Sequence, residues 1–214
     1  MLGIYVTVPI ACFRRGLARE YLETEPLPPP ATCYGFLLSL VGETDRRRHI
    51  GCRVTLMLLN RPDISVVLRT IWRVKKTPLG SPGNTRPDYQ QLLSPVELSI
   101  WLDSAEESSG ERLETRVMRA LEHPDSIERF GGLCLGESTH LVDEVSLWDR
   151  VKDRFEYRSR TGKAFLLTEC GRLNLPVWVD HVGSAGTRYV TGNLVPDWPL
   201  DRMPERERMP RIEP

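Results

Sequence analysis

The stretch PLPPPATCYGFLLSLVGE, from Pro26 to Glu43, decides the fold because it predicts a short helix with two defined ends. Proline suits a first helical turn, where its missing N–H would have no intrahelical partner. Gly42 stands where a left-handed C-terminal cap is wanted. Between these ends, residues at helical spacing give one apolar face: Tyr34, Leu37, Leu38 and Val41.

Strands are predicted on both sides of this helix. Residues 2–8 carry apolar side chains at every second position, and Pro9 closes the strand. After the helix, the same alternation predicts strands at 52–58 and 64–74. The polar turn at 60–63 separates them, so we expect these two strands to form a hairpin. In the second of them, Arg69, Arg73 and Lys75 share one sheet face, which could hold a nucleic-acid backbone or be an ordinary solvated face.

The segment 75–94 is rich in proline and glycine and is expected to be an irregular loop, functional or disordered. A strand is predicted at 96–102. Ser108 and Glu111 make a capping box for a second helix, which stops near Pro124. Its apolar face consists of Leu113, Val117, Ala120 and Leu121.

A glycine segment, RFGGLCLGES at residues 129–138, follows the second helix. Three glycines in six residues permit a tight backbone with exposed N–H groups. Further strands are predicted at 141–145, 164–168 and 176–182, the last two as a terminal hairpin. From Pro196 the chain is rich in proline and charge, so a mobile tail is expected.

Composition bounds the function less than charge distribution does. The 214 residues fit one domain with additions or two small domains, and the 29 basic and 29 acidic residues balance. Residues 1–89 carry a net charge of +6, and the remainder carries −6. A basic first half suggests a polyanion-facing side and an acidic second half suggests protein contacts; the alternative is that solvated charges segregate by chance.

Several kinds of site are not indicated. Five widely spaced cysteines contain no C-x-x-C pair, which suggests neither zinc nor disulfides and fits a reducing compartment. The glycine segment lacks the spacing of a dinucleotide fingerprint and no P-loop lysine follows it. Neither a signal peptide nor a run of about 18 apolar residues is present, so we expect a cytoplasmic protein without a membrane partner. No cofactor or metal is expected.

Two residue types leave alternatives open. His49 follows three arginines and could act as a general base for RNA cleavage, but a single histidine in a basic loop is more often solvated. The five tryptophans could stack on RNA bases, but packing in a core or an interface is the commoner use. They are Trp72, Trp101, Trp148, Trp178 and Trp198.

The order of predicted elements resembles an α+β, ferredoxin-like (RRM-like) domain of the RAMP superfamily of CRISPR systems. Residues 27–42, a proline run followed by G-h-L-x-x-h-x-G, resemble the first-helix signature of the Cas-five family. Residues 129–138 resemble that family's glycine segment, with Leu133-Cys134 in place of its common arginine. The resemblance implies a palm domain over 1–145 with a thumb insertion at about 75–95. A small C-terminal β extension at 146–195 and a flexible tail at 196–214 complete the expected domains.

The resemblance also implies a function. Proteins of this family are non-catalytic subunits of type I CRISPR effectors (Cascade) that cap the 5′ handle of the crRNA. They contact a backbone subunit and the large subunit, meet target DNA through the complex, and place a thumb at the handle–spacer boundary. In one subtype the family member cleaves precursor RNA, so a metal-independent endoribonuclease is the alternative. A protein-interaction subunit without RNA contact is a third hypothesis, motivated by the balanced charge.

Phosphate contacts need arginine and lysine, and a single-stranded handle is recognised by stacking and backbone N–H groups. The candidate RNA-contacting residues therefore come from the glycine segment and from three basic sets, numbered in chain order: residues 14–19, residues 46–48 and residues 69–76. They are Arg14, Arg15, Arg19, Arg46, Arg47, Arg48, Arg69, Arg73, Lys75, Lys76, Gly131, Gly132 and Ser138. The first and third basic sets could converge on one sheet surface, whereas the set at 46–48 could lie at the opposite end.

Overall fold

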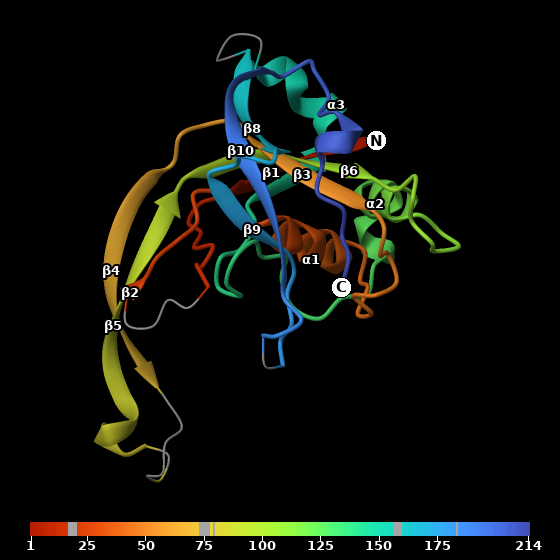
Figure 1. Ribbon diagram of the computed structural model, residues 1–214. Coiled ribbons are helices and arrows are strands. Elements are labelled where there is room, and N and C mark those ends of the chain that lie inside the picture. The colour runs from red at the N-terminus through yellow and green to blue at the C-terminus, as the bar shows by residue number, and fades with distance from the viewer. Residues whose placement is uncertain (17–20, 73–77, 79, 156–159, 183) are drawn as a thin grey trace.

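The computed structural model describes residues 1–214 apart from 17–20, 73–77, 79, 156–159 and 183. Its main body is an antiparallel seven-stranded sheet that curls, with the strand order β7-β1-β6-β3-β8-β10-β9 (Figure 1). The strands are β1 (Leu2–Val8), β3 (Arg53–Leu58), β6 (Val96–Asp103), β7 (Glu144–Leu147), β8 (Thr161–Leu167), β9 (Leu173–Trp178) and β10 (Arg188–Pro199).

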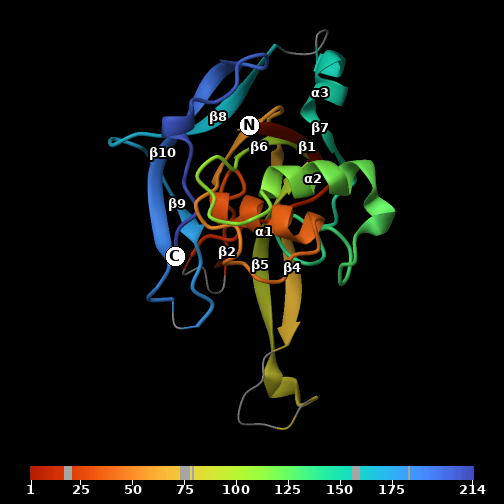
Figure 2. The ribbon, with the colours of Figure 1, turned by 90° about the vertical axis from the view of Figure 1, so that its right-hand side faces the viewer.

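A second, three-stranded sheet forms an arm that projects from the body (Figures 1 and 2). Its order is β2-β5-β4, from β2 (Tyr21–Leu22), β5 (Thr85–Ser94) and β4 (Asp63–Trp72). The long strands β4 and β5 are antiparallel along their whole length, from Asp63 opposite Ser94 to Trp72 opposite Thr85. The helices are α1 (Pro30–Leu40), α2 (Leu113–Glu122) and α3 (Trp148–Val151), and the short 3-10 turns are η1 (Pro82–Asn84), η2 (Pro124–Ser126), η3 (Lys152–Phe155) and η4 (Arg206–Arg208).

The first helix forms where the sequence predicts it. Pro30 is its first residue, Val41 is its C-cap, and Gly42 adopts a φ of +67°. The N–H of Glu43 donates to the Leu38 carbonyl at 2.9 Å and that of Gly42 to the Ser39 carbonyl at 3.2 Å. These two bonds make a Schellman ending, which only a residue that tolerates a positive φ can form without strain.

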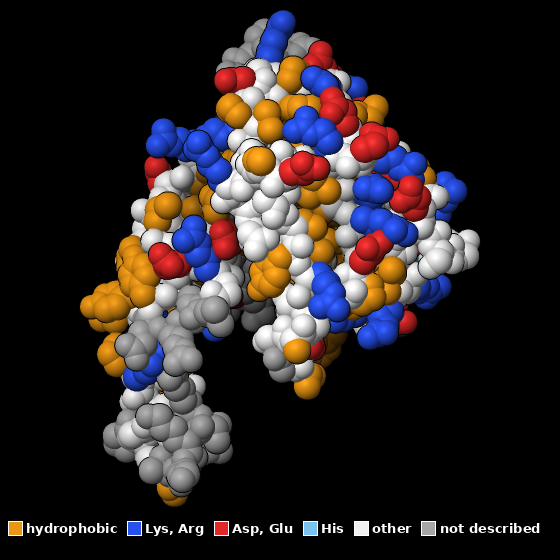
Figure 3. Space-filling view, in the orientation of Figure 1, with side chains coloured by type: hydrophobic (Ala, Val, Ile, Leu, Met, Phe, Trp, Pro, Cys, Tyr) orange, Lys and Arg blue, Asp and Glu red, His pale blue; other side chains and the backbone are white. Residues whose placement is uncertain are grey.

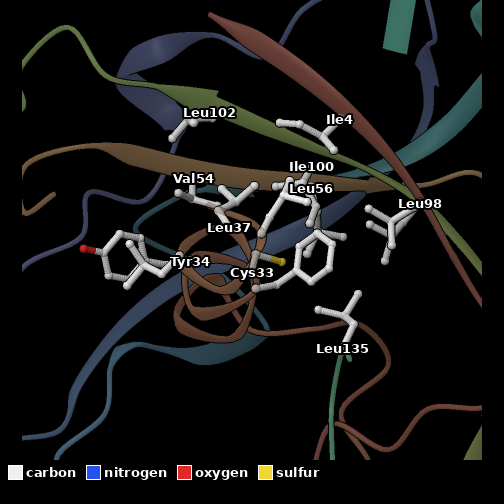
Figure 4. Packing of buried hydrophobic residues seen from close by; sticks show 14 of the residues in the cluster. Ile4, Cys33, Tyr34, Leu37, Val54, Leu56, Leu98, Ile100, Leu102 and Leu135 are labelled. Carbon is white, nitrogen blue, oxygen red and sulfur yellow. The ribbon is translucent and has the colours of Figure 1, made fainter. Parts of the chain in front are cut away.

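The core lies between α1 and one face of the sheet. In Figure 4, Tyr34 and Leu37 of α1 lie with Leu56 of β3, Ile100 of β6 and Ile4 of β1, and all five are buried. Helix α2 adds Leu113, Val117 and Ala120 to the same cluster. A buried aliphatic side chain stabilises the fold by about 1.5–3 kcal/mol relative to exposure. The predicted apolar faces of both helices are therefore the ones that pack.

The opposite face of the sheet has its own smaller core. Because strand side chains alternate, Tyr5, Met57 and Trp101 point away from α1. They pack with Trp148 of α3 and Phe155, whose ring centroids are 5.5 Å apart. The sheet is thus covered on both faces, by α1 and α2 on one and by α3 on the other.

Two predictions about the middle of the chain were wrong. The expected hairpin of 52–58 with 64–74 does not form, because β3 pairs with β6 and β8 while β4 pairs with β5 in the arm. The expected irregular loop at 75–94 contains β5 from residue 85 onward. Pro87 and two glutamines hide the strand pattern of β5, which is exposed or half-buried along much of its length. The arm therefore starts at Asp63, earlier than the predicted thumb insertion.

The second half of the chain also differs in detail. No capping box forms at Ser108 and Glu111, since α2 begins at Leu113. The orphan N–H groups of Leu113 and Glu114 instead donate to Glu107 Oε2 at 3.0 Å and Ser104 Oγ at 3.3 Å. The strand predicted at 141–145 is displaced to β7.

The predicted terminal hairpin was wrong because β8 and β9 do not pair with each other. Both pair with β10, which the sequence did not predict, and a register shift interrupts β10 between Val195 and Trp198. Nor is the end of the chain a loose tail. Met209 and Ile212 are fully buried, and the N–H groups of Gly51 and Val54 donate to the carbonyls of Ile212 and Pro210 at 3.0 and 2.9 Å.

Candidate nucleic-acid interface

The glycine segment is fixed to the middle part of the β4–β5 ladder through one carboxylate. Arg69 of β4 donates to Glu137 Oε2 at 3.1 Å, and Gln90 of β5 donates to Glu137 Oε1 at 3.0 Å. Burial would raise the pKa of Glu137, but the hydrogen bonds from Arg69 and Gln90 and the positive charge of Arg69 outweigh burial and lower it. The carboxylate is therefore ionised at neutral pH and holds the segment against both long strands of the arm.

His140 fixes the other side of the same segment. Its Nδ1 accepts the N–H of Cys12 at 3.2 Å and that of Glu137 at 3.0 Å, so Nδ1 carries no proton and the ring is neutral. Burial lowers the pKa of His140, in agreement with this role as acceptor. Gly136, with a φ of +111°, supplies the turn that brings these groups together.

The tip of the segment is exposed. Gly131, Gly132 and Ser138, three of the predicted contacts, are exposed, and Gly131 has a φ of +78°. Phe130 is fully exposed, at 105% of its reference area. The sequence analysis missed Phe130, although its position between Arg129 and a glycine is a usable signal. An exposed ring on a fixed loop is a stacking surface for a base or a partner side chain.

The first basic set lies beside this segment. Residue 11 bridges to Leu93 at the base of β5, and residue 14 bridges to Thr24. Arg14 and Arg15 are exposed, and the Arg15 guanidinium lies 3.4 Å from Glu25 and 3.9 Å from Glu23. The structure therefore places Arg14 and Arg15 beside β2 of the arm, and Cys12, two residues before Arg14, donates to His140 next to the glycine segment. Arg19 lies outside the described residues.

Of the third set, Arg69 is the member that the structure describes, because Arg73, Lys75 and Lys76 lie outside the described residues. Arg69 contacts the glycine segment as given above. The other face of β4 is apolar and exposed, as the patch on the arm in Figure 3 shows. We call it the arm face; its members are Ile64 (62% exposed), Val66 (50%), Leu68 (62%) and Trp72 (61%).

Tyrosines extend the exposed apolar surface of the arm to its other strands. Tyr89 of β5 lies opposite Leu68 in the ladder, and its ring centroid is 6.4 Å from that of Tyr21 on β2. Of the five tryptophans, four are buried and Trp72 is exposed. The four buried tryptophans therefore pack inside the protein, whereas Trp72 is available to a partner.

The second basic set, Arg46 to Arg48, makes contacts within the protein through two of its members. The Arg46 guanidinium lies 4.1 Å over the Trp178 ring and donates to the Val179 carbonyl at 2.6 Å. Arg48 pairs with Glu43 at 3.0 Å, and Arg47 is exposed. Arg46 thus lies beside β9 and Arg48 near α2, and Arg46 lines one hollow with Cys134 and Gly136 of the glycine segment.

His49 is neither a solvated residue nor an exposed base. It is fully buried, with Nδ1 bonded to Glu107 and Nε2 2.8 Å from Arg116 Nη1. Arg116 also reaches Glu43 Oε2 at 2.5 Å. Burial would raise the pKa of Glu43, but the hydrogen bond from Arg116 and neighbouring donors lower it to about 2. His49 therefore belongs to a buried ionic cluster that joins the loop after α1 to α2.

Other kinds of site find no support in the described part of the chain. Within it, no three His, Cys, Asp or Glu side chains lie close enough to hold a metal ion. None of the helices described is both long and apolar enough to cross a membrane.

Comparison with known proteins identifies the family. No protein-family model matches the chain. A curated relative from Myxococcus xanthus (strain DK1622), described as "CRISPR-associated protein Cas5", is 53% identical over 216 residues, which cover 99% of this chain and 97% of the relative.

Two solved structures are similar in fold. A chain of a "CRISPR RNA-guided surveillance complex" has a TM-score of 0.59 at 16% identity and covers 92% of this chain and 91% of its own length. A "Cas protein" has a TM-score of 0.54 at 16% identity, over 95% of this chain and 97% of that one. The identity to the curated relative, over nearly the whole of both chains, shows that this chain belongs to the Cas5 (Cas-five) family of CRISPR-associated proteins.

Proposed function

We propose that the chain is a non-catalytic subunit of a type I CRISPR effector (Cascade) that binds and caps the 5′ handle of the crRNA. The carrying observation is the glycine segment, which Glu137 fixes to the arm while Phe130, Gly131 and Gly132 stay exposed. Single-stranded RNA is bound by such surfaces, through stacking on rings and hydrogen bonds from backbone N–H groups. Arg14 and Arg15, beside β2 of the same arm, would contact phosphates.

The strand order also supports a fold for the proposed palm domain. The order β7-β1-β6-β3, with α1 and α2 on one face, supports a ferredoxin-like palm. In this proposal the β4–β5 arm is the thumb at the handle–spacer boundary, and β8, β10 and β9 form the C-terminal extension. The chain acts in the cytoplasm and meets target DNA only through the complex.

Different surfaces of the protein suit different proposed partners. Among its described members the arm face carries no charge, so it fits an apolar protein surface better than a phosphate backbone. We assign it to the backbone subunit. The acidic second half of the chain provides other surfaces for the large subunit.

Reconstitution with crRNA tests the proposal. The tagged protein, co-expressed with its operon, is expected to co-purify with backbone subunits and short RNAs that share one 5′ handle. Phe130→Ala should weaken handle binding about tenfold, since one base–aromatic stack contributes about 1–3 kcal/mol. Arg150→Ala, an exposed arginine with only a 3.9 Å contact to Glu122, is the matched control and should change nothing. An assembly free of RNA would instead support a pure interaction subunit.

The endoribonuclease alternative loses its motivating residue, because His49 is buried. The same purified protein, incubated with repeat RNA in chelator, is expected to leave the RNA intact. Cleavage that survives repeated purification would contradict the non-catalytic assignment.

A further inference from the structure

The outer side of the arm is an open strand edge. Strand β4 ends the order β2-β5-β4, and among the described residues no segment other than β5 pairs with it. Figure 1 shows β4 along the outer side of the arm, with β2 on the side of the body. Such an edge presents unpaired backbone N–H and C=O groups, so a further strand can bind to it.

The other sheet edges in the described part of the chain are short or blocked. Strands β7 and β2 have 4 and 2 residues, and β9 carries Pro176, which cannot donate a backbone hydrogen bond. Strand β4 has 10 residues with neither a proline nor a lysine, and its ladder with β5 runs without a register shift. The features that commonly prevent edge-to-edge pairing are therefore missing from β4.

The charges of β4 are complementary to those of a second β4. When two copies lie antiparallel about a two-fold axis at Val66, residues 63–69 of one copy pair with residues 69–63 of the other. Asp63 of each copy then stands opposite Arg69 of the other. Asp63 is exposed, and Arg69 is partly exposed and binds Glu137 through Nη1, which leaves it further N–H donors. The pairing therefore gains two cross-strand pairs of opposite charge.

The apolar side chains of the arm face match in the same register. Val66 lies opposite Val66 of the other copy, and Ile64 lies opposite Leu68. These side chains are 50–62% exposed in the single chain, and cross-strand neighbours would cover part of each. Edge pairing thus reduces the exposure of apolar groups that the fold itself does not bury.

Neighbouring registers lack this match. A two-fold axis at Val67 places Asp63 opposite Ile71, and an axis at Leu68 places Arg69 opposite Val67. Both put a charged side chain against an apolar one. Because a two-fold axis perpendicular to the sheet keeps paired residues on one face, shifts of this kind are the competing registers.

We propose that, outside the effector, two copies of this chain pair through β4, so that their three-stranded arms form one continuous sheet. The inference goes beyond the proposed function, because it concerns the free chain and needs no RNA. The dimer protects the open edge from pairing with unrelated strands until the chain enters an assembly.

A single cysteine at the two-fold axis tests the register. Opposite residues of an antiparallel pair have Cα atoms about 4.5–5.5 Å apart, within the range of a disulfide. We expect Val66→Cys to form a disulfide-linked dimer under mild oxidation, in a Cys170→Ser background because Cys170 is exposed. Leu68→Cys is the matched control. Its two copies would be offset by about 13 Å along the strands, too far to be bridged.

Light scattering on the nuclease-treated full chain measures the association itself. The wild type should change from monomer to dimer as its concentration rises. Asp63→Lys should raise the dissociation constant about tenfold, because two pairs of opposite charge become pairs of like charge. Asp125→Lys makes the same charge change at an exposed site away from the arm and should leave the constant unchanged.

The results that would overturn the inference are distinct from those that bear on RNA. A wild type that stays monomeric up to its solubility limit overturns it, as does equal cross-linking of Val66→Cys and Leu68→Cys. Equal weakening by Asp63→Lys and Asp125→Lys overturns it too. If Val66→Cys cross-links to a different subunit of the reconstituted effector while the free chain is monomeric, the edge belongs to that subunit. The proposed function is tested separately, because none of these measurements depends on handle binding.

Discussion

Strands β3 and β4 follow each other in the chain and have a similar share of apolar residues. The side chains of β3 are mostly buried, whereas those of β4 are mostly exposed. In β3, Val54 and Leu56 are fully buried against α1, and Met57 is buried on the other face. In β4, the apolar residues of the arm face are at least half exposed. Apolar side chains that the fold does not bury contribute little to its stability. The comparison therefore separates residues that build the domain from residues that are available to partners.

The largest expected effect tests this separation directly. Leu56→Ala removes a fully buried side chain and should lower the free energy of unfolding by about 2–5 kcal/mol. Leu68→Ala, at a site that is 62% exposed, should change it by less than about 0.5 kcal/mol. Denaturant unfolding of the full chain measures both. Similar losses for the two variants would show that the arm is part of the cooperative core.

The elements that the sequence predicts well are those with local signals. Pro30 and Gly42 mark both ends of α1 within a dozen residues, and the structure places the helix between them. Strand β10 has no such signal, because exposed polar residues and a register shift interrupt its alternation. The partner of β4 was mispredicted for a related reason, since a nearby turn suggested β3 and the true partner lies beyond the segment 73–77.

The candidate site was predictable to a smaller extent. The exposed glycines could be predicted, because φ-permissive residues in a cluster indicate a special loop. The role of His49 could not, because its partners Glu107 and Arg116 are 58 and 67 positions away in the sequence. Glu137 likewise meets Arg69 across 68 positions. Side-chain partners so distant depend on the tertiary fold rather than on spacing.

A second, intermediate effect compares two glycines with similar backbone angles. Gly42 in the body has a φ of +67° and faces the Glu128 carbonyl, whereas Gly131 has a φ of +78° with open space around its Cα. Gly42→Ala should cost about 1–3 kcal/mol from strain and collision, and Gly131→Ala about 1 kcal/mol from the backbone alone. Thermal unfolding of both variants compares them. Equal losses of stability in the two variants would indicate that the backbone around Gly42 shifts at little energetic cost.

The smallest effect on stability, and the most informative for function, is expected on the arm face. The variant carrying Ile64→Ser, Leu68→Ser and Trp72→Ser should unfold almost as the wild type does, because each side chain is already more than half exposed. Val182→Ser with Met203→Ser, also at exposed positions, is the control.

In the reconstituted effector, the same arm variant should bind the backbone subunit at least tenfold more weakly, because a buried tryptophan anchor contributes about 2 kcal/mol or more to an interface. Pull-down at increasing salt distinguishes this apolar contact from an RNA contact. Apolar association strengthens or stays constant with salt, whereas phosphate binding weakens steeply. A triple variant that assembles normally, or whose assembly defect disappears in low salt, would remove the arm face from the protein interface. In that case the exposed side chains of β4, unlike the buried ones of β3, would be assigned to an RNA-binding surface rather than to a protein interface.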